Sequence, residues 1–276
     1  MTYPPFIDIH THVLYGVDDG AKDRDQSQKM LEQALQQGIT QLVITPHITD
    51  LSARPIIERI LDHFQQLQQM VSGQKLPLQL FSGAELFYNE RIFDWLIEPW
   101  ATINNNGKYF LFELPLFDFP KGVSEFIFQA KLKGITPILA HPERYIYLHK
   151  NMEKLISWHQ QGCLMQMNAG SLTGHFGDEV AEFSRHLLEF RFYDLVASDA
   201  HNTEVRNFKV LPKAYEIANS ILPVETCQLL FSTNPGKAIT GEPIHQYTLK
   251  EDLIRKNWFQ QFFKNIKRIK RNQRIF

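Results

Sequence analysis

Short apolar runs alternate with amphipathic stretches along most of the chain. Residues 6–12, FIDIHTH, alternate apolar and polar positions and predict a strand, whereas 27–38, SQKMLEQALQQG, has helical spacing and ends at a glycine. Residues 39–47, ITQLVITPH, predict a second strand. The same alternation returns in LPLQLFSGAEL (76–86), YFLFELP (109–115), VSEFIFQAKLKG (123–134), ITPILAHPE (135–143), GCLMQMNAG (162–170), AEFSRHLLEF (181–190) and FYDLVASDAH (192–201).

Repeated pairs of a strand and a helix favour parallel βαβ units and an α/β fold. Six or seven such units in sequence favour a barrel over a sandwich or a bundle. The 21 phenylalanines predict a core rich in aromatic side chains. We expect one barrel domain over residues 1–247, followed by a separate basic segment over residues 248–276.

Polar side chains recur where the predicted strands end. In parallel barrels this edge carries the chemistry, because the loops that follow the strands converge there. Two pairs, His10 with His12 and Asp199 with His201, are spaced i, i+2, so both members of a pair face one side of a strand. The alternative for each pair is an ordinary polar strand end. The other candidates at these ends are His47, Glu85, Glu113 and His141.

Glu85 and Glu113 each finish an apolar run, where a carboxylate is costly unless it is paired or bound to metal. The alternative is a salt bridge. Asp19 lies in the acidic segment 16–20, which is otherwise read as an Asp-Gly turn. Arg144 follows His141 by three positions and Arg206 follows His201 by five. Either guanidinium can bind two phosphate oxygens at once through a bidentate contact. For Arg206 the alternative is a surface role.

The nine histidine, aspartate and glutamate candidates together predict a metal cluster. Imidazoles mixed with carboxylates and without thiolates suit Mn²⁺, Fe²⁺ or Zn²⁺, and nine donors exceed what one ion needs, so two or three ions are expected. Such clusters generate hydroxide near neutral pH and clamp phosphoryl oxygens. Other phosphatase and hydrolase schemes fit poorly, because the sequence has no Walker A loop, no GxSxG elbow and no cysteine followed by arginine six positions later.

The composition of the chain bears on the cellular location and the binding partners of the protein. Hydrophobic residues make up 43% and charged residues 21%, and Cys163 and Cys227 are the two cysteines, which fits a reducing cytoplasm. The sequence shows no signal peptide and no apolar run of about 18 residues, so a cytoplasmic location is expected. Residues 250–276 carry nine basic and two acidic groups, a net charge of +7 against −8 for the rest. This acidic body argues against nucleic acid as a partner.

The basic segment at the carboxyl terminus has apolar residues at helical spacing. The pattern predicts an amphipathic helix that contacts an anionic membrane surface or a partner. The alternative is a terminal helix that packs its aromatic stripe on the barrel. The apolar positions are Ile254, Trp258, Phe259, Phe262, Phe263, Ile266 and Ile269, and the basic ones include Lys264, Lys267, Arg268 and Arg271.

The order of these motifs resembles the PHP-domain superfamily, over about residues 6–241. The motifs are DIHTHVLYGVDDGAKD, TPH, GAELF, ELP, AHPER, NAGSLTGHFG and VASDAHN followed by RNF. More narrowly, DDGAKD and SDAHNTEVRNF resemble the bacterial manganese-dependent protein-tyrosine phosphatases of capsule and exopolysaccharide operons. The resemblance implies a distorted (β/α)₇ barrel, a trinuclear site and Mn²⁺ as the preferred ion. The implied ligands are His10, His12, Glu85 and Asp199 for a first ion, Glu85, Glu113 and His141 for a second, and Asp19, His47 and His201 for a third. Arg144 and Arg206 would bind the phosphate.

The function expected from this resemblance is hydrolysis of phosphotyrosine on a bacterial tyrosine kinase that regulates capsule or exopolysaccharide synthesis. Three alternatives stay open at this point. One is a small-molecule phosphatase of the histidinol-phosphate type, and the second is a polymerase-associated exonuclease. The third is a metal-binding module without turnover.

Overall fold

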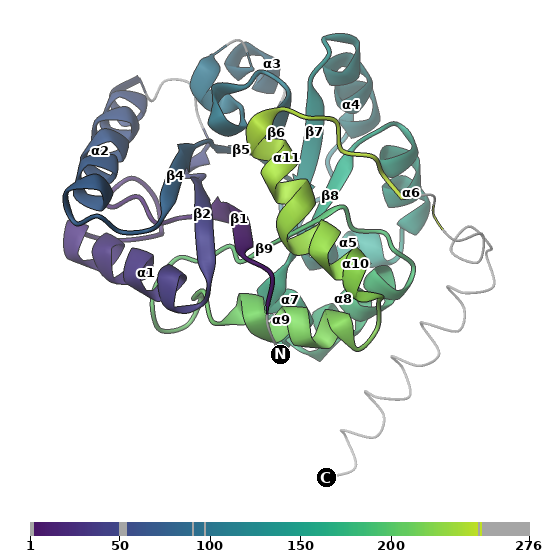
Figure 1. Cartoon of the computed structure of the whole chain (residues 1–276). Coiled ribbons are helices and arrows are strands. Elements are labelled where there is room, and N and C mark those ends of the chain that lie inside the picture. Colours follow the sequence, from purple (N-terminus) through teal and green to yellow (C-terminus); the bar gives the residue numbers. More distant parts are fainter. Residues whose placement is uncertain (1–2, 50–53, 90, 97, 248, 250–276) are drawn as a thin grey trace.

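The computed structural model describes residues 3–49, 54–89, 91–96, 98–247 and 249. In this part of the chain, strands occupy the centre and helices cover the outside (Figure 1). All strand pairs are parallel. The strands are β1 (Phe6–Thr11), β2 (Ile39–Ile44), β3 (His47–Ile48), β4 (Gln79–Ser82), β5 (Glu85–Phe87), β6 (Tyr109–Glu113), β7 (Thr136–Ala140), β8 (Leu164–Asn168) and β9 (Leu195–Ala197).

The strands form two ladders, β1-β2-β4 and β3-β5-β6-β7-β8-β9. Because β3 continues β2 along the chain and β5 continues β4, the two ladders together supply seven strand positions. The last position meets the first, since Asp199 N–H donates to the His10 carbonyl over 2.9 Å and His12 N–H donates to the Ala200 carbonyl over 2.9 Å. The expected distorted (β/α)₇ architecture is therefore confirmed, although β4 and β6 do not pair in these ladders.

Two predicted strands are each broken in two, which the sequence pattern did not indicate. The segment 39–47 breaks at Thr45 and Pro46, because proline has no N–H for the ladder. The segment 76–86 breaks before β5, where a Cβ on Gly83 would lie 2.9 Å from Val43 Cγ1. Each break starts a new short strand whose first residue is a predicted ligand, His47 in β3 and Glu85 in β5.

The helices follow the strands in sequence. Helix α1 starts at Arg24, earlier than the expected residue 27, because Asp23 caps it by accepting from Gln26 N–H over 2.8 Å. The longer helices are α1 (Arg24–Gln36), α2 (Arg54–Gly73), α4 (Val123–Leu132), α6 (Met152–Gln160), α8 (Asp178–Glu189) and α9 (Val210–Asn219). The short ones are α3 (Ile92–Trp95), α5 (Ile146–His149), α7 (Ala169–Leu172), α10 (Val224–Gln228) and α11 (Asn234–Thr240). Single turns are η1 (Pro99–Ala101), η2 (Ile103–Asn105), η3 (Pro142–Arg144) and the π-helical η4 (Leu229–Thr233).

The core has an inner and an outer layer. The inner layer joins strand residues such as Ile9, Leu111 and Ile138 with Ala238 and Ile239 of α11. Helix α11 lies across the strands in Figure 1. It closes the interior at the amino ends of the strands, opposite the candidate ligands, because Tyr109 Oη at the start of β6 donates to the carbonyl of Glu242, just after α11, over 2.7 Å. The outer layer, between strands and helices, is rich in aromatics as expected; its fully buried rings include Phe110, Phe112, Phe183, Phe192, Phe208 and Phe231.

The predicted basic helix falls on residues outside the described ones, apart from Leu249, and the boundary between residues 247 and 248 stays a prediction. Among the described residues, no helix is both long enough and apolar enough to cross a membrane. Cys163 and Cys227 are free thiols in the interior, and burial raises the pKa of both, to about 11 for Cys227. Neither is suited to act as a thiolate nucleophile.

Candidate metal centre

The predicted ligands converge at the carboxyl edge of the strands. His10 lies in β1, Glu113 ends β6, and His141 and Asp199 follow β7 and β9. Most of these side chains are withdrawn from solvent, and Glu85 is fully buried. The exceptions are Asp19, His47 and Glu113, whose side chains are 62%, 24% and 13% exposed. The structure thus brings together the nine candidates from seven segments of the chain.

Four donor atoms face one another at the centre of the site. His10 Nε2 lies 3.0 Å from Glu85 Oε2 and 3.5 Å from Asp199 Oδ1. His12 Nε2 lies 3.3 Å and 3.4 Å from the same two oxygens, and the two Nε2 atoms are 3.2 Å apart. A tetrahedral ion bound at about 2.0–2.2 Å by nitrogen and oxygen requires ligand atoms at about this spacing.

The hydrogen bonds of the two Nδ1 atoms show that the Nε2 atoms of His10 and His12, which face the centre of the site, carry lone pairs. His10 Nδ1 lies 2.8 Å from Gln166 Oε1, and His12 Nδ1 lies 2.8 Å from Asp18 Oδ2. Both partners accept hydrogen bonds, so each imidazole carries its proton on Nδ1 when it is neutral. Two nitrogen lone pairs and two carboxylate oxygens then converge in a buried space, an arrangement that a bound cation stabilises. The donor set therefore fits a divalent metal.

Glu85 connects this group to a second one. Its Oε1 lies 3.1 Å from His141 Nε2, and its Oε2 lies 3.0 Å from His47 Nδ1. Glu113 Oε1 is also 3.0 Å from His47 Nδ1, and Glu113 Oε2 is 4.0 Å from His141 Nε2. His47, Glu85 and Glu113 offer donor atoms within 4.8 Å of one another. One carboxylate contacts four imidazoles, as expected of a ligand shared between ions.

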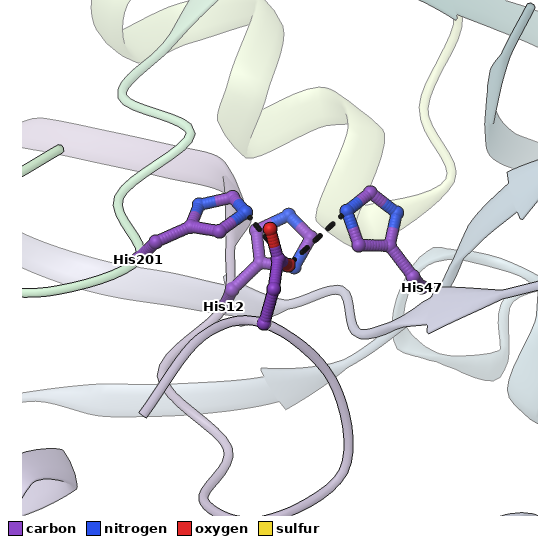
Figure 2. Close-up of side chains that lie close together, drawn as sticks. His12, His47 and His201 are labelled. Carbon is purple, nitrogen blue, oxygen red and sulfur yellow. Dashed lines mark ion pairs between the residues drawn. The ribbon is translucent and has the colours of Figure 1, made fainter. Parts of the chain in front are cut away.

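A third group gathers around Asp19. Asp19 Oδ1 lies 3.2 Å from His201 Nε2 and 3.5 Å from His47 Nε2. The rings of His12, His47 and His201 approach one another from three separate segments, and they form a four-membered donor group with Asp19 (Figure 2). His47 therefore faces the second group with Nδ1 and the third with Nε2, a double role that the sequence did not indicate.

The pKa values show what a cation replaces. Burial lowers the pKa of His47, but Glu85 and Glu113 raise it by more, to about 10, and the pKa values of His10 and His12 are also raised. Protons on these rings thus balance the carboxylates when no metal is bound. Burial and the nearby Arg144 lower the pKa of His141 to about 4, so this ring is neutral at physiological pH.

Metal affinity is expected to fall as the pH falls, because the ion must displace the proton from His47. The raised pKa means that this proton stabilises the metal-free fold fully below about pH 6.5, and the contribution is lost as the pH rises through about 10. Between pH 6 and 9, each proton that the ion must displace lowers the metal affinity by about tenfold for every unit by which the pH is lowered. Titration calorimetry with Mn²⁺ in two buffers of different ionisation enthalpy measures the proton release directly. Affinity that does not change with pH would contradict the expectation.

The two arginines meet on the second oxygen of Asp199. Arg144 Nη1 donates to Asp199 Oδ2 over 3.1 Å and Arg206 Nη2 over 2.6 Å, while Asn168 Nδ2 donates over 2.7 Å. Asp199 Oδ1 therefore faces the histidines and Oδ2 faces the guanidinium groups. Both arginines line a cavity of about 430 Å³ together with Asp19 and other members of the donor groups.

Two of the candidate ligands adopt strained backbone conformations. His141 has φ 37° and Asp199 has φ 55°, in the left-handed region that non-glycine residues rarely enter. His141 directly follows β7 and Asp199 lies two residues after the end of β9, and each such conformation costs roughly 1–3 kcal/mol. Strain of this kind clusters at functional sites, because the surrounding contacts hold the side chain in one working position.

Sequence reasoning did not assign roles to the polar residues that orient the ligands. Gln166 and Asp18 hold the rings of the first group, and Asn168 holds Asp199. Glu143 is fully buried and accepts from Asn168 N–H over 2.9 Å, and burial raises its pKa to about 7. Gln166 carried a usable signal, since a buried amide inside an apolar strand is costly without partners.

Replacing Gln166 by methionine is expected to weaken metal affinity by about 10- to 100-fold. The substitution keeps the length of the side chain but removes the acceptor for His10 Nδ1–H, so the ring is no longer held with Nε2 inward. Calorimetric titration with Mn²⁺ measures the loss, and excess Mn²⁺ should restore most of the rate. Gln79→Met, on the exposed face of β4, is the matched control. Unchanged affinity in Gln166→Met would leave that side chain without an orienting role.

The fold and the site together define a class. A parallel α/β barrel that gathers imidazoles and carboxylates at the strand ends is the arrangement of a metal-dependent hydrolase, and the two arginines beside these donors favour a phosphate ester as the substrate. Within that class, the chain belongs to the CpsB/CapC family of capsular polysaccharide synthesis proteins, whose sequence model matches residues 6–240.

Named relatives agree with this assignment. The chain is 32% identical to tyrosine-protein phosphatase YwqE of Bacillus subtilis over 209 residues, 76% of this chain and 82% of that protein. It is 28% identical to tyrosine-protein phosphatase CpsB of Streptococcus pneumoniae over 243 residues, 86% of this chain and 100% of that protein. A crystal structure from a study of YwqE and CpsB, described as unique metal-dependent tyrosine phosphatases, matches with TM-score 0.81 and 29% identity, over 88% of this chain and 98% of that one. The resemblance noted in the sequence is thus confirmed.

Proposed function

We infer that this chain is a metal-dependent phosphatase that hydrolyses phosphotyrosine. One observation carries the inference: an ion-binding group, defined by four converging donor atoms, shares Asp199 with two arginines that line the same cavity. Relatives named as tyrosine-protein phosphatases match most of the chain, which supports the choice of substrate class.

The proposed ligand assignment follows the donor groups. His10, His12, Glu85 and Asp199 would hold one ion, Glu85, Glu113 and His141 a second, and Asp19, His47 and His201 a third. Bound divalent ions would supply a nucleophile from water near neutral pH and neutralise charge on the phosphoryl oxygens. We propose Mn²⁺ as the native ion, since mixed imidazole and carboxylate donors without thiolates suit it, with Fe²⁺ and Zn²⁺ as competitors.

The protein's own groups bind and orient the phosphate. Arg144 and Arg206 would each donate to phosphoryl oxygens that carry more charge in the transition state than in the ground state. Their shared contact with Asp199 Oδ2 limits how far either guanidinium can turn away. The leaving group is a phenolate with a pKa of about 10, so the reaction does not require a strong general acid.

The test measures turnover and metal together. The protein is treated with a chelator, reloaded separately with Mn²⁺, Zn²⁺, Fe²⁺ or Mg²⁺, and assayed on p-nitrophenyl phosphate, phosphotyrosine peptides and matched phosphoserine peptides. We expect activity on phosphotyrosine only in reloaded protein, with Mn²⁺ giving the largest recovery. Equal turnover of phosphoserine peptides or an aliphatic phosphate monoester would overturn the substrate class.

The physiological substrate that we propose is a phosphorylated bacterial tyrosine kinase of the capsule or exopolysaccharide system. The support is the family description, capsular polysaccharide synthesis, together with the phosphatase names of the relatives. Incubation with a phosphorylated kinase of that system, followed by anti-phosphotyrosine detection, tests the proposal. Retention of the phosphate on the kinase, while phosphopeptides are hydrolysed, would reject it.

We also propose that the basic segment over residues 250–276 contacts anionic membrane. The support is the sequence pattern alone, nine basic groups with an aromatic stripe at helical spacing. Each basic group near anionic lipid adds roughly 1 kcal/mol to binding. In a vesicle sedimentation assay, the full chain should bind phosphatidylserine vesicles, and replacing Lys264, Lys267, Arg268 and Arg271 with glutamate should abolish binding. Equal sedimentation of both proteins would reject the proposal.

A further inference from the structure

The loop that follows β6, called the β6 loop and comprising residues 114–119, is held at both ends. Leu114 N–H donates to Tyr145 Oη over 2.8 Å, and Tyr147 Oη donates to the Pro115 carbonyl over 2.7 Å. At the far end, Phe119 packs edge-on against Tyr147 with ring centroids 5.6 Å apart. The backbone of the β6 loop is thus fixed by aromatic residues of the neighbouring segments.

Between these anchors the β6 loop presents apolar side chains to solvent. Leu116 is 39% exposed and Phe117 is 92% exposed. Phe117 contributes almost nothing to the core, and with Leu116 and the 43% exposed Ile146, which line one cavity, it forms a group of exposed apolar side chains of the kind that binds another molecule. Both side chains line the 430 Å³ cavity that contains Arg144 and Arg206.

A second cavity begins on the other side of the same two side chains. It has a volume of about 580 Å³ and shares Leu116, Phe117 and Arg144 with the catalytic cavity. Ile146 of α5 and Val180 of α8 also line it. We call this cavity the flanking groove.

The chemistry of the flanking groove is apolar with a basic edge. Phe176 lines it and carries the Arg144 guanidinium over its ring, 4.4 Å from the centroid. Ile146 is 43% exposed and Val180 is buried, so an apolar side chain in the groove can contact apolar surface both at its edge and at its base. Lys150 lines the groove as well and is exposed, which adds positive charge.

We propose that the flanking groove binds the residues of a substrate polypeptide that lie next to the phosphotyrosine. This inference rests on the proposed phosphatase function. When the phosphoryl group contacts Arg144, the tyrosine ring leaves the catalytic cavity along Leu116 and Phe117, and the polypeptide backbone continues beyond them. The flanking groove is continuous with the catalytic cavity at these three residues, so it is an apolar surface that the neighbouring residues reach. A cavity of about 410 Å³ adjoins the catalytic cavity on the side of His47, but it is lined by three acidic residues, whereas the flanking groove has none. Its composition selects an apolar side chain, with an acidic one near Lys150.

The first experiment tests selectivity in the wild-type protein. A set of phosphotyrosine peptides, in which each of the three positions on either side is changed in turn to leucine, glutamate, lysine or glycine, is assayed in the Mn²⁺-loaded full chain. At one or two positions, leucine should raise kcat/KM about tenfold over glycine, the size expected of an apolar contact in a pocket. Equal kcat/KM for all peptides would overturn the proposal. Lack of turnover on any phosphotyrosine compound would instead reject the phosphatase function.

A substitution in the flanking groove tests the location. Ile146→Glu should lower the ratio of kcat/KM on the preferred leucine peptide to kcat/KM on p-nitrophenyl phosphate by about tenfold. The matched control is Leu132→Glu, which places the same charge at a residue of α4 that is 67% exposed and lies outside the groove. An unchanged ratio in Ile146→Glu, or an equal fall of the ratio in the control, would overturn the proposal.

A charge reversal provides a measurement that loss of fold cannot imitate. At the peptide position nearest to residue 150, the wild-type protein should prefer glutamate, and Lys150→Glu should prefer lysine. The variant should therefore have a higher kcat/KM on the lysine peptide than the wild-type protein has. The same preference in both proteins would place the substrate outside the flanking groove. If size-exclusion chromatography showed that Ile146→Glu converts a dimer into a monomer, the occupant would be a second copy of the chain, and the proposal would fail.

Discussion

Replacing Glu85 with alanine is expected to lower kcat by about 10³-fold or more and to reduce the amount of bound metal. Glu85 is fully buried and its two oxygens contact His10, His12, His47 and His141. Without it, the imidazoles lose the negative charge that they share, so ions bound on either side of this carboxylate lose a common ligand. Metal analysis of the purified protein and steady-state kinetics on p-nitrophenyl phosphate measure the two effects.

The isosteric Glu85→Gln variant separates charge from volume. It keeps the packing but removes the negative charge, so we expect nearly the same loss of activity with less effect on thermal unfolding. Glu98→Ala, an exposed carboxylate outside the donor groups, is the control and should match the wild type. A Glu85→Ala protein with wild-type metal content and rate would mean that the donor groups do not act as one cluster.

Arg144→Ala and Arg206→Ala are each expected to lower kcat/KM by about 10²–10³-fold while metal content is retained. Asp199 Oδ2 accepts from both arginines and from Asn168, so either single variant leaves two of the three donors on this oxygen. The loss therefore reports on phosphate binding and not on the orientation of Asp199. Each variant is loaded with Mn²⁺ and assayed on p-nitrophenyl phosphate.

The double variant reveals whether the arginines act on one phosphoryl group. If they do, the fold-loss of kcat/KM in the double variant should be smaller than the product of the two single fold-losses, because the effects of groups that act as a unit are not additive. The control is Arg185→Ala, an exposed arginine on α8. Near-normal kinetics for both single variants would mean that Arg144 and Arg206 hold Asp199 but do not bind the phosphate.

The sequence predicted the strand ends and most of the candidate ligands because most of these residues end or directly follow a predicted strand, a pattern that is visible without knowledge of the fold. Asp19 is the exception, since it lies in the acidic segment 16–20. We did not predict the breaks at Thr45–Pro46 and before Glu85. The first reflects the missing N–H of Pro46, and the second depends on how closely Gly83 approaches Val43, which the sequence does not show. Nor did the sequence predict that His47 faces two donor groups, because spacing along the chain does not determine how a ring is turned.

The orienting residues were not identified for a related reason. Gln166 and Asn168 lie in the segment 162–170, where each looks like a polar position in a short strand. Their roles arise only when β8 lies beside β7 and β9, which places the amide of Asn168 on Asp199 and that of Gln166 on His10. An amide inside an apolar strand indicates that Gln166 needs a partner, but the sequence does not indicate which residue that partner is.

The junction between β1 and the segment after β9 also has a consequence for synthesis of the protein. His10 and His12 leave the ribosome early, whereas Asp199 and His201, which lie beside them in the folded barrel, leave about 190 residues later. At the usual rates of bacterial and eukaryotic translation this interval lasts roughly 10–40 s. During that time a nascent chain has the first two imidazoles but lacks the carboxylate that completes their group. We therefore expect that capture of an ion by these four donors follows closure of the barrel, so that an incomplete chain does not assemble the proposed metal site.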